Sequence, residues 1–407
     1  MKKLFFTGCV FMSILANAQQ PQALDTVMLD TKIPLERQQS GKVITKISNE
    51  QLQARPGASV AELLNEVSGI EINGARSNDG QNLSYYVRGG RNRQVVIMVD
   101  GVQLNDPSQI ANDYDLRLIP ASAIEEIEIL KGASSVLYGS GAATAVINIT
   151  TKKTSEKDIS ATFTSTLGSN RPTESDFKED TKFETFTNNV NVSGTVNRFF
   201  YNANFSNRYT NGLSAVAAPA DSTRFESDVF DRFNTRLNLG YKISDSITIS
   251  QFVAIDKFKA DFDNFDYTDA NNQSITEQIK TGGHFEWKYK QGTYVFNDSY
   301  QWIDREIISD FPSKFEAKSY SLDTYLNHRI TDAFQAVLGL NVNLSEFNSF
   351  TIPFGATQFE SQIDSDTANF DIIDPYLNLV YQTNFGLNLN AGVRANIHSV
   401  YDTHVVY

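Results

Sequence analysis

The stretch IEEIEILKGASSVLYGSGAATAVINITTKK, residues 124–153, divides the chain into two parts with different sequence patterns. It predicts a strand over 124–130, turns at Gly132 and at 138–141, and a second strand ending at 148–151. Before this stretch, predicted helices and strands mix as in a small α+β domain. After it, residues 154–407 alternate apolar and polar positions between turn signals. We therefore expect two architectures that join here.

The part before the stretch carries clear local signals. Ser48 with Gln51, and Ser59 with Glu62, have the spacing of capping boxes and predict two helix starts. Asp100-Gly101 predicts a tight hairpin turn, and 120–124 predicts a short helical turn. The apolar residues of the second helix share one face: Val60, Leu63, Leu64 and Val67. Strands are predicted at 43–47, 70–72, 85–88 and 95–99.

The part after the stretch predicts about eleven strands, because turn signals separate runs of period-2 alternation. Tight connections are predicted near 197, 244–245, 291–292, 331–332 and 383–384. Long connections are predicted near 169–182, 213–228, 259–277, 306–315 and 349–368. Alternation of short and long connections is typical of a transmembrane barrel. The 28 Phe, 17 Tyr and 2 Trp fit aromatic girdles, and a large soluble β-sandwich is the alternative.

The strand number predicts an incomplete barrel. Eleven strands cannot close an even-numbered antiparallel barrel, and a barrel that holds a domain inside needs about 22 strands. An open edge in lipid would leave backbone groups without hydrogen bonds. We expect the chain to be the front half of a longer, truncated protein. A small barrel of 10 or 12 strands would leave no room for an inner domain.

Spaced motifs in residues 85–150 resemble the plug domain of TonB-dependent outer-membrane receptors. They are Val87 to Gly90, Val95 to Gly101 (VVIMVDG), Glu125 to Gly132, Tyr138 to Ser140 and Val146 to Thr150. The chain departs from the family at Gly132-Ala133, where Gly-Pro is usual, and at Thr144-Ala145, where Gly-Gly is usual. The resemblance implies a plug domain over 40–153 inside a transmembrane antiparallel β-barrel that begins at 154. The matching plug residues are Arg88, Gly89, Asp100, Gly101, Gly132, Tyr138 and Gly139.

The N-terminus reads as a secretory signal over residues 1–18, with two lysines, a short apolar core and small residues before a cleavage site. Residues 19–39 contain Pro21 and Pro34 without helical periodicity, so we predict a mobile segment. The resemblance implies that its extended patch is a TonB box, which pairs as a strand with the energy-coupling protein TonB. A plain polar linker is the alternative. The patch consists of Asp25, Thr26, Val27, Met28 and Leu29.

An acidic segment lies on a predicted outer loop. Carboxylate clusters of this kind suit calcium, which accepts six to eight oxygen ligands. Cobalamin (vitamin B12) receptors in the resembled family use calcium to order such loops, so calcium is the one cofactor the sequence suggests. Four solvated carboxylates are the alternative. The candidate ligands are Asp261, Asp263, Asp266 and Asp269, with Asp221 and Asp228 on the preceding loop.

Three arginines surround Gly89-Gly90: Arg88, Arg91 and Arg93. In the resembled family, plug arginines meet carboxylates of the barrel wall and hold the plug in the lumen. Ordinary surface arginines are the alternative.

Composition excludes several other classes of function. A net charge of −13 argues against nucleic acid as a partner, because phosphate binding needs a basic patch. Gly139-Ser140-Gly141 is not followed by a βαβ unit, which argues against a nucleotide site. The four histidines lack metal-ligand spacing, and Cys9 falls in the predicted signal. No catalytic motif occurs, so we do not expect an enzyme.

Together these observations predict a receptor in the outer membrane that contacts lipid and imports a small-molecule ligand with energy delivered through TonB. Cobalamin is the first candidate ligand, and a ferric siderophore or haem is the alternative. A passive porin or a structural barrel is the alternative from another class, although it gives a plug no role.

Overall fold

The computed structural model describes Lys32 and residues 42–407 apart from 56, 76, 78, 110–111, 170–182, 212–213, 215, 217–224, 265–267, 384, 401–404 and 407. The chain divides into two compact units, residues 1–41 and residues 42–407. The second unit is the one described below. We call residues 42–151 the plug and the large sheet that follows the wall.

The plug combines short helices with two small sheets. Its strands are β1 (Val43–Ile47), β2 (Ile70–Asn73), β3 (Ser84–Val87), β4 (Val95–Val99), β5 (Val102–Leu104), β6 (Ile124–Lys131) and β7 (Ala145–Thr151). Its helices are α2 (Asn49–Gln53), α3 (Val60–Asn65), α4 (Ser135–Tyr138) and the 3-10 turns η3 (Asn92–Gln94), η4 (Leu116–Leu118) and η5 (Ala121–Ala123). Both predicted capping boxes, Ser48 with Gln51 and Ser59 with Glu62, are present.

The quoted stretch forms the middle of the plug sheet, whose strand order is β1-β6-β7-β4-β5. Strands β6 and β7 pair antiparallel, and β4 runs parallel to β7. Residues 135–138, of which only Tyr138 was placed in a predicted turn, form the single-turn helix α4 between them. Ile127, Ile147 and Ile149 in these strands are fully buried and pack with Leu64 of α3. The stretch that the sequence predicted as the junction of two architectures therefore forms the core of the plug.

Two plug motifs form tight turns that favour left-handed backbone conformations. Asp100 and Gly101 have φ of 51° and 81° and join β4 to β5 as a hairpin. Arg88 and Gly89 have φ of 49° and 80° between Val87 and Gly90, which exchange two backbone hydrogen bonds of 2.9 Å. Consecutive residues with positive φ define the type I′ turn, and glycine adopts the second position without steric cost. These motif residues therefore have a local structural role, because the two tight turns need their left-handed backbone conformations.

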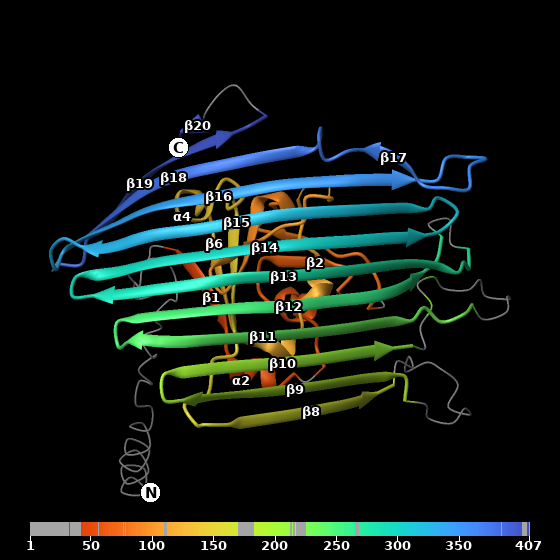
Figure 1. The fold of residues 1–407 in the computed structure, drawn as a ribbon, viewed down its shortest axis with the longest axis horizontal. Helices are drawn as coiled ribbons and strands as arrows, with labels where there is room; N and C mark the ends of the chain where they lie inside the picture. Colours follow the sequence, from red (N-terminus) through yellow and green to blue (C-terminus); the bar gives the residue numbers. More distant parts are fainter. Residues whose placement is uncertain are drawn as a thin grey trace, which may run out of the picture. The chain divides into compact units, whose positions relative to one another are not determined.

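The wall consists of eleven long strands and two short ones among the residues that the structure describes. Strands β8 to β16 follow one another as neighbours, and β18, β19 and β20 continue the sheet, as Figure 1 shows. The short strand β17 pairs only with β16. The bounds are β8 (Ser160–Gly168), β9 (Thr185–Val196), β10 (Phe199–Thr210), β11 (Phe230–Ser244), β12 (Ile247–Phe262), β13 (Asn272–Tyr289), β14 (Gly292–Ile308), β15 (Ser313–Arg329), β16 (Phe334–Thr351), β17 (Glu360–Ile363), β18 (Asn369–Gln382), β19 (Asn388–His398) and β20 (Val405–Val406).

The connections alternate largely as predicted, with one correction. Two residues join β9 to β10, β11 to β12 and β13 to β14, whereas long connections join β8 to β9, β10 to β11 and β12 to β13. The long connection predicted at 306–315 is wrong, because β14 ends at Ile308 and β15 begins at Ser313. Charged residues there continue the strands in register, with Glu306 opposite Lys314. Charged residues close to the turn made the ends of these strands read as a loop.

The wall has the opposite polarity to the sheets of a soluble protein. On β11, Leu237, Leu239 and Tyr241 point outward and are 41–46% exposed, whereas Asn234 faces the plug and is 2% exposed. On β13, Ile279 is 40% exposed while Gln278 is fully buried. A buried polar face with an exposed apolar face is typical of a transmembrane barrel and is not expected of a soluble β-sandwich. Among the described residues, no helix has the length and apolar character needed to cross a membrane.

Candidate functional site

Among the described residues, polar and charged side chains concentrate where the plug contacts the wall. Three carboxylates of the plug form ion pairs with arginines of the wall. Asp79 pairs with Arg208 of β10 at 2.7 Å, and Asp100 pairs with Arg236 of β11 at 2.9 Å. The third pair joins Asp106 to Arg305 of β14 and lies almost entirely out of solvent. The plug is thus attached to three wall strands by charged groups.

The expected plug–wall pairing of Arg88, Arg91 and Arg93 is wrong for the described residues, because the pairs run in the opposite direction. Arg88 donates a long hydrogen bond of 3.4 Å to the backbone oxygen of Lys131, inside the plug. Arg91 precedes η3 as its N-cap residue. The alternative of ordinary surface arginines fits them better. In the observed pairs the wall supplies the cation and the plug supplies the carboxylate.

Asp100 has a second role besides its ion pair. Its carboxylate accepts hydrogen bonds of 2.8 Å from both the backbone N–H and the hydroxyl of Thr151, the last residue of β7. The β4–β5 turn, the end of the plug and Arg236 of the wall therefore meet at one carboxylate. Asp100, predicted from the motif as a plug residue, lies at the turn between β4 and β5, and only the structure gives its partners.

Arg117 is the centre of a buried cluster. Its guanidinium pairs with Asp115 at 2.7 Å, donates to Asn82 at 3.1 Å and lies 4.4 Å from the ring centre of Phe258 on β12. Its backbone oxygen accepts a hydrogen bond of 3.1 Å from Arg232 of β11. Burial alone would raise the pKa of Asp115, but the charge and hydrogen bonds of Arg117 hold this pKa below its ordinary value. The cluster joins two plug segments to two wall strands.

A second polar network connects the plug to β11, β12 and β13. The hydroxyl of Tyr114 donates to Gln278 at 2.7 Å and accepts from Lys280 at 3.1 Å. Lys280 pairs with Asp256 at 2.9 Å, and Asp256 accepts from Asn234 at 2.7 Å. Burial raises the pKa of Tyr114 to about 12, so the phenol stays protonated and keeps donating at neutral pH.

We expect Arg305→Lys to loosen the plug near Asp106. Arg305 bonds both Asp106 and Ser108, and an ammonium group cannot reproduce that two-pronged geometry. Losing one hydrogen bond to a charged group costs about 1.5–3 kcal/mol, so the free energy of local opening of residues 102–109 should fall by about that amount. Hydrogen exchange of these amides measures it. Lys318→Arg, in a pair that is about half exposed, is the matched control and should change nothing; unchanged exchange in both variants would contradict the prediction.

The acidic segment is only partly the outer loop that was predicted. Asp261 lies in strand β12 opposite Gln273, which corrects its assignment to a loop. Asp263 follows the strand and accepts hydrogen bonds from the backbone N–H groups of Val216 and Ala270 at 3.1 and 3.0 Å. Asp269 is exposed, and Asp266 lies outside the described residues, as does Asp221. Within the described part of the chain, no group of three or more Asp, Glu, His or Cys is arranged to hold a metal ion.

The remaining predicted features lie where the structure gives no description. The signal segment and the patch from Asp25 to Leu29 are outside the described residues. The TonB box, the signal and calcium therefore remain predictions. Asp228 is described and buried. Sequence reasoning missed Arg208, Arg236 and Arg305, although single arginines on the polar face of alternating strands were a usable signal.

The sequence comparisons agree with this geometry. Residues 36–146 match the family profile of the TonB-dependent Receptor Plug Domain. The chain carries a TonB-dependent receptor plug. The vitamin B12 transporter BtuB of Vibrio vulnificus strain YJ016 is 36% identical over 140 residues, covering 33% of this chain and 22% of that protein. BtuB of strain CMCP6 is 23% identical over 418 residues, covering 88% of this chain and 67% of that protein.

The solved structures support the fold. The siderophore receptor PirA of Pseudomonas aeruginosa superimposes with a TM-score of 0.65 at 17% identity, covering 89% of this chain and 57% of that one. At this identity the likeness concerns the fold alone: a receptor plug with part of a β-barrel. The chain thus spans little more than half the length of that receptor, and its alignments span 22% and 67% of the two B12 transporters.

Proposed function

We propose that this protein is an outer-membrane receptor that binds a scarce ligand outside the cell and imports it to the periplasm with energy supplied by TonB. The observation that carries the proposal is a receptor plug held against the polar face of a wall whose other face is apolar and exposed. The apolar face suits lipid and the polar face suits an aqueous lumen. A plug in that lumen suits gated import better than it suits a passive porin.

The plug–wall contacts support a plug that moves. They are ion pairs and hydrogen bonds such as Asp79 with Arg208 and Asp100 with Arg236, both of which keep partial exposure to solvent. Their side chains are 13–30% exposed, so water can reach both pairs and replace a partner more easily than in the buried pair of Asp106 with Arg305. Part of the plug can therefore leave the wall without unfolding either body. The energy for that step would come from TonB, which pairs with Asp25 to Leu29 as an added strand.

Cobalamin is our first candidate ligand, and an iron chelate is the second. The two B12 transporters support the first, since one is 36% identical over a third of this chain and the other is 23% identical over most of it. The likeness to a siderophore receptor supports the second only through the shared fold. We also propose calcium near Asp263 and Asp269 as an aid to ligand binding, although Asp263 already links two loops through its own hydrogen bonds.

The test compares binding and uptake in cells that carry the full-length protein. We expect labelled cobalamin to bind at the cell surface with or without a protonophore, and uptake to stop when the protonophore is added. A chelator should weaken binding if calcium orders the loop at Asp263. Uptake that ignores the protonophore would favour a passive barrel instead. Binding of a ferric siderophore without binding of cobalamin would replace the ligand and keep the receptor.

A further inference from the structure

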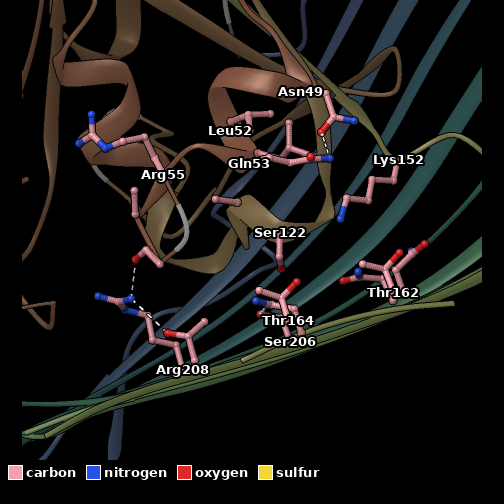
Figure 2. A pocket seen from close by; sticks show the side chains of 18 of the residues that line it. Asn49, Leu52, Gln53, Arg55, Ser122, Lys152, Thr162, Thr164, Ser206 and Arg208 are labelled. Carbon is pink, nitrogen blue, oxygen red and sulfur yellow. Dashed lines mark hydrogen bonds between the residues drawn. The ribbon is translucent and has the colours of Figure 1, made fainter. Parts of the chain in front are cut away.

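A cavity of about 330 Å³ lies between the plug and the first wall strands. On the plug side it is lined by α2, the segment after it and η5, and on the wall side by β8, β9, β10 and β11. Figure 2 shows Gln53 and Ser122 on the plug side, facing Thr164, Ser206 and Arg208 on the wall. Thr187 and Asn191, both on its lining, are four residues apart on β9, so the cavity extends about 13 Å along the wall.

The wall side chains that line the cavity have different hydrogen-bond partners from the wall side chains that meet the plug elsewhere. On β11, Asn234 donates directly to the plug oxygen of Leu118 at 2.9 Å, and on β19 Arg394 donates to the oxygen of Val136 at 3.2 Å. In the cavity, wall side chains bond one another instead. Ser206 donates to Asn189 at 2.8 Å, and Asn191 donates to Asn202 at 2.9 Å. These neutral side chains of β9 and β10 are therefore paired within the wall.

Direct bonds between plug and wall mark the two ends of this gap. Asn202 donates to the backbone oxygen of Lys152 at 3.0 Å, near the short-turn end of β10. Arg208 holds Asp79 and the backbone oxygen of Gly57, six residues further along the strand. Between these points the plug segment 49–58 faces neutral hydrophilic side chains across open space. Moving this segment away from the wall breaks the bond from Arg208 to Gly57 and exposes Leu52 of the plug core, whereas moving the plug away from β11 or β14 breaks the clusters around Arg117 and Asp106.

The charge of the cavity is opposite to that of the chain. Its charged lining residues are Arg55, Lys152, Arg208 and Arg232, and no Asp or Glu is among the described residues that line it, although the net charge of the chain is −13. Arg55 and Arg208 pair with Glu66 and Asp79, so Lys152 and Arg232 supply the charge that a passing anion would meet. Arg232 is 6% exposed, and its Nε makes no hydrogen bond to any described residue. The hydroxyl of Ser122 on the plug side is likewise buried without a described partner. Buried donors without acceptors favour a ligand that brings oxygen acceptors.

We propose that the ligand passes the plug along this gap, between segment 49–58 and strands β8 to β11, and that the gap selects hydrophilic molecules bearing phosphate or carboxylate groups. The inference rests on the import function proposed above and adds the side of the plug and the chemistry of the passenger. A cavity of about 330 Å³ accepts such a group, and outward movement of segment 49–58 widens it for the whole molecule.

Filling the gap tests the route. Thr164→Trp places a bulky ring in the cavity from β8, and Phe163→Trp, the next residue on the lipid-facing side and 68% exposed, is the matched control. We expect Thr164→Trp to reduce the energised uptake rate about tenfold with unchanged surface binding, equivalent to a barrier higher by about 1.4 kcal/mol. The control should behave as wild type. Equal uptake in both variants and wild type would overturn the route. Wild-type uptake that needs no energy would instead overturn the proposed function.

The charge preference has a test that needs no ligand. Asn189→Cys in a Cys9→Ala background puts a thiol on the cavity lining. An anionic and a cationic methanethiosulfonate reagent are compared, and the labelling rate of each is divided by its rate with a free thiol in solution. We expect this ratio to be higher for the anionic reagent. Adding Lys152→Gln should reduce this preference, and Lys152→Arg should keep it. Equal relative rates for the two reagents, or a preference that Lys152→Gln leaves unchanged, would overturn the proposed selectivity.

Discussion

Deleting Asp25 to Leu29 is expected to abolish energised uptake and leave surface binding of the ligand unchanged. The segment is predicted to pair as a strand with TonB, and main-chain hydrogen bonds would transmit the pull to the plug. Ligand binding needs only the outer side of the receptor. Without the segment, the ligand would be held and not imported. Labelled ligand in the periplasm, compared with ligand bound to whole cells, measures both effects.

A point variant makes this test sharper. Val27→Pro removes one backbone N–H and fixes φ, so it should reproduce most of the deletion. Val27→Ile keeps the backbone donor and the β propensity, and should transport normally. Uptake that survives both the deletion and Val27→Pro would show that energy reaches the plug by another route. Loss of binding in the deletion would mean that the segment supports folding.

Arg117→Met is expected to loosen the plug where it meets β12. The methionine fills much of the same space, but Asp115 is left buried without its cation, and the guanidinium over Phe258 is lost. Removing one partner of a buried ion pair typically costs about 3–5 kcal/mol. We expect the free energy of local opening around 115–118, measured by hydrogen exchange, to fall by about this amount. Arg55→Met, in a pair that is nearly half exposed, is the matched control and should leave the free energy of local opening around 115–118 unchanged.

The pH dependence of the stability deficit in Arg117→Met distinguishes the lost ion pair from lost packing. In the wild type, Arg117 holds the pKa of Asp115 below its unfolded value of about 3.9, so this contribution to stability is present at neutral pH and is lost as the pH falls through the folded pKa. In Arg117→Met, burial is no longer opposed and the pKa of Asp115 rises above the unfolded value. The deficit of the variant should therefore be largest at neutral pH and shrink in acid. A deficit that does not vary with pH would point to lost packing instead.

Much of the plug followed from local sequence rules. The capping boxes at Ser48 and Ser59 and the turn at Asp100-Gly101 were predictable because each depends on residues within three or four positions. The same rules failed at strand ends that contain charged residues. Residues 306–315 read as a loop because charged and turn-forming residues lie close together there, yet β14 continues to Ile308 and β15 begins at Ser313, with Glu306 opposite Lys314. Asp261 was placed on a loop for the same reason.

The sequence by itself determined the two architectures and the boundary between them near residue 153. It also determined the alternation that gives the wall one polar face and one apolar face. Only the tertiary structure decided which side chains meet across the lumen. Asp79 and Arg208 are 129 positions apart, and Asp106 and Arg305 are 199 apart. Their pairing depends on the register of every intervening strand, because a shift of one residue turns each side chain to the opposite face. The same accumulated register places the cationic cavity beside β8 to β11, where no local pattern could have located it.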